Sequence, residues 1–268
     1  MEVALVLLLI YLALGAVAGA IAGLLGLGGG VIIVPALIYS FAWQGMPESV
    51  LTHLAVGTSL ATIAVTSISS VRTHHLHGAV LWKVFLWMVP VVVIGVWLGA
   101  NIANTLSGAN LQFAYGIFLL CVAIQMGLGL QPKGEKNFQA GAALLAPSGI
   151  IGVFSAMFGI GGGSLTVPYL SWRGLIIQKA VATSAAVGLP VAIVGAITNI
   201  VVAWGHRDLP AYSSGYVYWP AFLGIVMTSA YCARFGAKLA HSMSPPRLKQ
   251  GFAFFALILG IHFIMKNL

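Results

Sequence analysis

Three consecutive glycines occur twice in this chain, and their positions suggest an anion-binding function. The first run is Gly28, Gly29 and Gly30, and the second, 133 residues later, is Gly161–Gly163. Glycine permits positive φ and a close approach of backbone N–H groups to a ligand. A short apolar segment follows each run, so we expect each to lie at a helix N-terminus, where backbone donors and the helix dipole favour an anion.

Hydroxyl side chains follow each glycine run in the same order. Thr58 and Ser59 occur in the sequence AVGTSLA, and Thr183 and Ser184 occur in AVATSAA. Thr62 lies one helical turn after Thr58. Each hydroxyl can donate to an anion without placing a charge in a bilayer, although it can instead bond to a carbonyl of its own helix.

We predict that one anion binds between the two glycine runs. The alternative is that the glycines only allow close packing of helices. The predicted substrate-binding residues are Gly28, Gly29, Gly30, Thr58, Ser59, Thr62, Gly161, Gly162, Gly163, Thr183, Ser184 and Asn199.

A few basic side chains near these elements could attract an anion. We predict steering roles for Arg72, Lys179 and His53, although basic side chains that reach toward a membrane interface are the plain alternative. His74, His75 and His77 have no Cys, Asp or Glu nearby, so we expect a solvated basic loop and no metal site.

The composition is that of an integral membrane protein. Of the 268 residues, 60% are hydrophobic and only 6% are charged, against about 25% charged in soluble domains. The net charge of +8 comes from basic residues scattered singly, a pattern that predicts membrane topology and no nucleic-acid partner. Paired carboxylates for acid–base catalysis are lacking in the sequence, so we expect no enzymatic activity and no cofactor.

The apolar segments form two series of about five. Long segments at 3–24, 51–71, 84–103 and 111–130 accompany a short one at 31–43, and the same order repeats after a polar break. The sequence predicts an all-α membrane protein with a first repeat at 1–130, a cytoplasmic linker at 131–138 and a second repeat at 139–268. Helices should break at the glycine runs, and the short segments could cross the membrane or re-enter it.

The basic residues decide the predicted topology. If each short segment returns the chain, ten Lys and Arg residues share one side, which must then be the cytoplasm, and only Arg207 and Lys266 lie on the other. Both termini are then periplasmic. Five segments per half is an odd number, so the second repeat should be inverted relative to the first.

At the paired Gly-x-Gly-Gly-Gly…Val-Pro-x-Leu motifs and the Thr-Ser elements, the chain resembles the sulfite exporter TauE/SafE family, also described as toluenesulfonate uptake permeases. The resemblance covers essentially the whole chain. It implies a secondary transporter of sulfite or an organosulfonate such as sulfoacetate in the bacterial inner membrane. A polytopic membrane enzyme and a passive anion channel are the alternatives, and a homodimer is left open.

Overall fold

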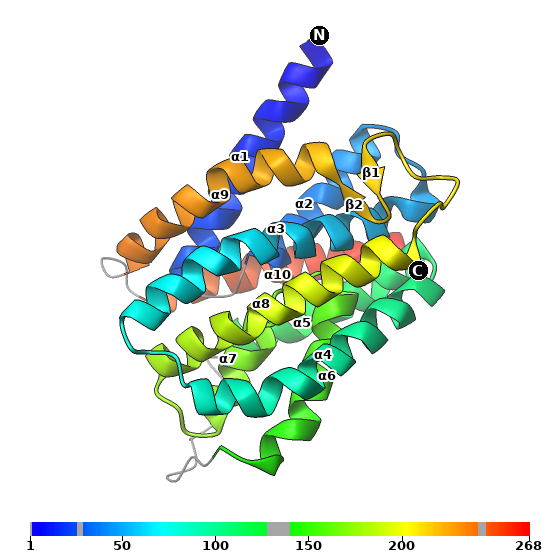
Figure 1. Cartoon of the computed structure of the whole chain (residues 1–268). Coiled ribbons are helices and arrows are strands. Elements are labelled where there is room, and N and C mark those ends of the chain that lie inside the picture. The colour runs from blue at the N-terminus through cyan, green and yellow to red at the C-terminus, as the bar shows by residue number, and fades with distance from the viewer. Residues whose placement is uncertain (1, 26–28, 128–139, 241–244) are drawn as a thin grey trace.

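Helices form almost all of the computed structural model, which describes residues 2–25, 29–127, 140–240 and 245–268 (Figure 1). The elements are α1 (Glu2–Leu25), α2 (Gly30–Trp43), α3 (Glu48–Leu76), α4 (Trp82–Thr105), α5 (Gly108–Gly127), η1 (Ala142–Leu144), α6 (Leu145–Met157), α7 (Gly163–Trp172), α8 (Ile177–Val202), β1 (Ser213–Ser214), β2 (Val217–Tyr218), α9 (Trp219–Ala240) and α10 (Pro245–Lys266). The linker predicted at 131–138 lies outside the described residues.

The lengths and surfaces of the helices identify a multi-pass membrane protein. Within the described residues, four helices, α3, α4, α5 and α8, are long and apolar enough to cross a membrane, and five shorter apolar helical stretches accompany them in α1, α2, α6, α9 and α10. Large apolar side chains cover the outside, among them Ile94 and Trp97 on α4 and Ile197 and Val201 on α8. The prediction of an all-α membrane protein is therefore confirmed.

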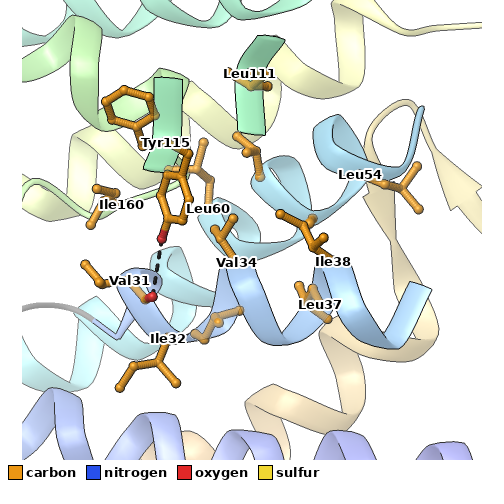
Figure 2. Packing of buried hydrophobic residues seen from close by; sticks show 14 of the residues in the cluster. Val31, Ile32, Val34, Leu37, Ile38, Leu54, Leu60, Leu111, Tyr115 and Ile160 are labelled. Atoms are coloured by element: carbon orange, nitrogen blue, oxygen red, sulfur yellow. Dashed lines mark hydrogen bonds between the residues drawn. The ribbon is translucent and has the colours of Figure 1, made fainter. Parts of the chain in front are cut away.

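The two helices that follow the glycine runs are too short to cross a bilayer. At about 1.5 Å per residue, α2 with 14 residues and α7 with 10 residues fall short of the roughly 30 Å hydrocarbon core. Figure 2 shows α2 buried by its own apolar side chains against α3 and α5. The Tyr115 hydroxyl on α5 donates to Val31 O over 3.2 Å and fixes the start of α2.

The helices of the two halves can be matched in order, α1 with α6, α2 with α7, α3 with α8, α4 with α9 and α5 with α10. When each helix is exchanged for its match, the pattern of packing between helices stays the same. Helix α1 packs on α9, and correspondingly α6 packs on α4. Helices α3 and α8 contact each other and lie side by side in Figure 1, as α5 and α10 also contact each other. The α3–α8 pair places the two Thr-Ser elements next to one another, and the helices that follow the glycine runs, α2 and α7, pack on α3 and α8 respectively.

Glycines allow the paired helices to approach closely, and the residues that they contact show whether the two helices of a pair run parallel or antiparallel. A Cβ on Gly15 or Gly19 of α1 would overlap backbone atoms of Ile225 or Ser229 on α9, so these helices run parallel. Helices α4 and α6 are likewise parallel, since Gly95 and Gly99 face Gly149 and Val153. Helices α5 and α10 are antiparallel, because Gly116 lies against Gly260 while Gly127 lies against Ala253.

Candidate functional site

The middle residue of each glycine run has a left-handed backbone and caps a helix. Gly29 (φ 73°, ψ −19°) is the N-cap of α2, and Gly162 (φ 76°, ψ −16°) is the N-cap of α7. Side chains with a Cβ rarely adopt this conformation, so glycine is needed at both caps. The predicted helix starts are confirmed at these residues, while Gly28 lies outside the described residues.

The turn just before the second run lies directly against the start of α2. A Cβ on Gly30 would lie 2.5 Å from Gly159 O and 2.9 Å from Ile160 Cα. The Ser59 hydroxyl donates to the same Gly159 carbonyl over 2.8 Å and ties α3 to this turn. Residues 129 positions apart in the chain therefore meet at this point.

The Ile63 side chain fills the gap between the two turns. Its Cδ1 lies 3.0 Å from a Cβ built on Gly30, and its Cγ2 lies 2.7 Å from one built on Gly161. Gly188 on α8 also packs closely against this turn, because a Cβ built on it would overlap Gly161 O. The turns are thus in direct contact in this conformation, and a ligand between them requires Ile63 to move.

The two duplicated threonines make equivalent hydrogen bonds. Thr58 Oγ1 accepts from the N–H of Tyr218 over 3.0 Å, directly before α9. Thr183 Oγ1 accepts from the N–H of Leu81 over 3.1 Å, directly before α4. Both threonines are fully buried, and each fixes the start of a helix in the other half.

The polar groups of three other predicted residues either bond within their own helix or have no partner. Thr62 Oγ1 donates to Ser59 O over 2.7 Å and Asn199 Nδ2 donates to Gly195 O over 2.8 Å, so both bond within their own helices. Ser184 is fully buried on α8, one turn before Gly188, and its hydroxyl has no partner. Of these three, only Ser184 has a hydroxyl free to bind something else.

The predicted steering residues differ in exposure. Arg72 near the end of α3 and Lys179 near the start of α8 are exposed. His53 is 4% exposed, with Nε2 3.0 Å from Ala103 O and its ring stacked 5.0 Å from that of Tyr216. Burial raises the pKa of Tyr216, whose neutral hydroxyl donates to Asn104 Oδ1 over 3.1 Å. The surroundings of His53 suit a packing role better than steering.

Three buried hydroxyls near the second turn were missed from the sequence. Ser155 on α6 and Ser164 and Thr166 on α7 are buried, and their oxygens have no hydrogen-bond partners. A comparison of the two glycine motifs position by position could have found two of them, because Ser164 and Thr166 stand where the first copy has Val31 and Ile33.

The polar groups buried in the described part of the chain are almost all neutral donors. They are hydroxyls, one histidine and two amides, with no Lys, Arg, Asp or Glu among them. Within the same residues, no three His, Cys, Asp or Glu side chains come together as metal ligands would. Such a core can bind a small polar or anionic solute through hydroxyls and backbone N–H groups.

Broken helices, a neutral polar centre and an apolar outer surface define a multi-pass membrane protein with internal helix ends, the architecture of a transporter. Residues 11–263 match the family described as Sulfite exporter TauE/SafE. The chain belongs to this family, as its glycine and Thr-Ser motifs predicted. The family and the names of its relatives indicate a membrane transporter, which is not an enzyme.

Curated relatives match along nearly their whole length. A probable membrane transporter protein of Haemophilus influenzae is 36% identical over 261 residues, which cover 97% of this chain and 98% of the relative. One from Methanocaldococcus jannaschii is 29% identical over 249 residues, 91% of each chain. YunE of Bacillus subtilis, also a probable membrane transporter protein, is 25% identical over 280 residues. No solved structure matches the chain.

Proposed function

We propose that this protein is a secondary transporter that moves a small sulfur-containing anion, sulfite or an organosulfonate such as sulfoacetate, across the bacterial inner membrane by alternating access. The observation that carries the proposal is the contact between two glycine turns from different halves, one of which caps α7 while the other caps α2. Two helix N-termini together supply about one positive charge equivalent. An anion is then bound without a buried Arg, whose burial in a membrane is costly.

The direction of the paired helices supports an inverted relation between the halves. Where a two-fold axis relates two halves, a helix that packs on its own counterpart shows the direction of that axis. An axis along the membrane normal makes such a pair parallel, whereas an axis in the membrane plane makes it antiparallel. Helices α5 and α10 are counterparts and run antiparallel, which favours the second arrangement.

Direct contact between the turns supports a gated site. Ile63 touches the Cβ positions of both Gly30 and Gly161, so an anion reaches the turns only when this side chain and the turns move apart. Movement of one half against the other would open the contact toward one side of the membrane at a time. The exposed Arg72 and Lys179 would attract the anion to the cytoplasmic side.

The test is binding and transport by the purified protein. Sulfite, thiosulfate, sulfate, taurine and sulfoacetate are titrated by calorimetry, and counterflow is measured in liposomes for those that bind. We expect at least one to bind and to show saturable counterflow. Failure of all five to bind and to exchange would overturn the proposal, and flux without counterflow would indicate a channel.

Glycine substitutions test whether the caps are involved. Gly29→Ala and Gly162→Ala should each weaken anion binding by more than about tenfold, since each distorts a helix N-terminus. Gly78→Ala is the matched control, because Gly78 has φ 63° in the turn after α3 and nothing within 4 Å of its Cβ position. It should have the same backbone strain but bind the anion normally.

A further inference from the structure

Three hydroxyls around the N-terminus of α7 are buried without hydrogen-bond partners. Ser155 and Thr166 are fully buried and Ser164 is 3% exposed. A Cβ built on the cap residue Gly162 would lie 3.5 Å from Thr166 Oγ1 and 3.6 Å from Ser155 Oγ, so both oxygens face the cap. Hydroxyls in apolar helices usually donate to a carbonyl of the preceding turn, as Ser148 does to Leu144 O. Leaving three of them unpaired is costly unless something else binds them.

The corresponding cap in the first half has no such donors. Gly29 has nearly the same backbone angles as Gly162, but its Cβ position faces the carbonyl oxygen of Ala18 and Ala22 Cβ, both at 3.4 Å, and Ile33 Cδ1 at 3.6 Å. Ala22 and Ile33 precede Ser155 and Thr166 by the same 133 residues that separate the two motifs. At the start of α2, apolar side chains and a carbonyl oxygen, which cannot donate to an anion, therefore stand where the start of α7 has hydroxyls.

Backbone donors complete the arrangement at α7. The first hydrogen bonds of this helix run from the N–H groups of Leu165 and Thr166 to Gly162 O, over 3.1 and 2.8 Å. The N–H groups of Gly163 and Ser164 come before them and have no partner within the helix. Neutral donors of two kinds thus converge at the positive end of the α7 dipole.

We propose that the hydrogen bonds to the anion come from one half of the molecule, at a site formed by Ser155 Oγ, Ser164 Oγ, Thr166 Oγ1 and the N–H groups of Gly163 and Ser164. The inference rests on the proposed transport function and assigns its substrate contacts. The ligand is a compact oxyanion with at least three acceptor oxygens on one atom, such as sulfite or a sulfonate head group. The start of α2 packs against this site, adds the positive end of its own dipole and closes the site, but it gives no hydrogen bond to the anion.

The experiment measures anion binding to purified full-length protein by calorimetry, with sulfite, sulfate, sulfoacetate, phosphate and acetate as probes. Ser155→Ala and Thr166→Val each remove one donor to a charged ligand and should weaken binding of the best probe by about tenfold or more. Thr166→Ser retains the hydroxyl and should bind within a few-fold of the wild type. Ser148→Ala removes a buried hydroxyl of α6 that already has its own partner, and its affinity should not change.

The outcomes separate this site from the proposed function. If sulfur anions bind and exchange but the Ser155 and Thr166 variants bind them normally, the site is wrong and the function stands. If phosphate is the only probe bound, and the same variants lose it, the site stands and sulfur specificity is wrong. Binding of none of the probes overturns the site. Should Thr166→Val not fold, Ser164→Ala removes another donor and gives the same test.

Discussion

Thr58 and Thr183 stabilise helix starts in the half opposite their own. Each hydroxyl oxygen accepts the N–H of the residue directly before a helix, Tyr218 before α9 and Leu81 before α4. Thr58→Val or Thr183→Val would remove the acceptor while preserving the shape of the side chain, leaving that N–H without its partner. We expect each variant to lose about 1–3 kcal/mol of unfolding free energy, measured as a lowered melting temperature in detergent.

Serine variants are the control for this prediction. Thr58→Ser and Thr183→Ser retain the oxygen and should lose less stability than the valine variants. The two threonines were predicted from the sequence to bind the anion, and the hydrogen bonds give a second reason for their duplication. Valine variants that melt like the wild type but no longer bind the anion would favour the ligand role and contradict the structural one.

At the residue scale, the sequence predicted backbone features better than side-chain partners. The positive φ of Gly29 and Gly162 follows from local chemistry, because few other residues adopt it between apolar helices. The hydroxyl partners of Thr58 and Thr183 lie in the opposite half, 160 and 102 residues away, and no local pattern encodes them. The unpartnered Ser155 was missed for the same reason, since a serine in an apolar helix usually bonds to its own backbone.

Two glycine contacts of the helix pairs are the most sensitive positions at the scale of the elements. A Cβ on Gly19 would overlap Ser229 O, and one on Gly99 would overlap Val153 O. Because these pairs occupy equivalent places, Gly19→Ala and Gly99→Ala should destabilise the protein by similar amounts, about 1–3 kcal/mol each. Thermal unfolding in detergent measures the loss.

Gly251 provides a control for these variants. It lies in α10 with nothing within 4 Å of its Cβ position, so Gly251→Ala should be neutral or stabilise the helix by up to about 1 kcal/mol. An alanine at Gly19 or Gly99 that is tolerated as well as one at Gly251 would show that the helix pairs are packed less closely than the structure indicates.

At the scale of elements, apolar length predicted the long helices of the first half to within five residues. The segment predicted at 84–103 is α4 (Trp82–Thr105), and the segment predicted at 51–71 lies within α3 (Glu48–Leu76). The hairpin of β1 and β2 was not predicted, because two-residue strands are too short to show an alternating pattern. The pairing of α1 with α9 was also beyond the sequence, since it depends on glycine contacts between distant segments.

The arrangement of the whole molecule predicts where the chain ends lie. The antiparallel pair α5 and α10 fits an inverted second half, and in the topology where each short segment returns the chain, the basic residues divide ten to two between the two sides. Because Lys and Arg are retained in the cytoplasm, the turn between α3 and α4 should face the cytoplasm and both termini the periplasm. The loop between α8 and α9, which carries Arg207, should share the periplasmic side with the C-terminus.

Cysteine labelling tests this topology in a background without the native thiols, made by Cys121→Ala and Cys232→Ala. His77→Cys reports on the turn after α3, Arg207→Cys on the loop before α9, and Leu268→Cys on the C-terminus; all three positions are exposed. A membrane-impermeant maleimide added to spheroplasts should label positions 207 and 268 but reach position 77 only after permeabilisation.

Labelling of 77 and 268 from the same side would contradict the inverted arrangement, because α4 to α10 would then return the chain to the side from which it started. The opposite pattern at all three positions would retain the inverted repeats but reverse the assignment of the cytoplasmic side, and with it the side from which Arg72 and Lys179 attract the anion.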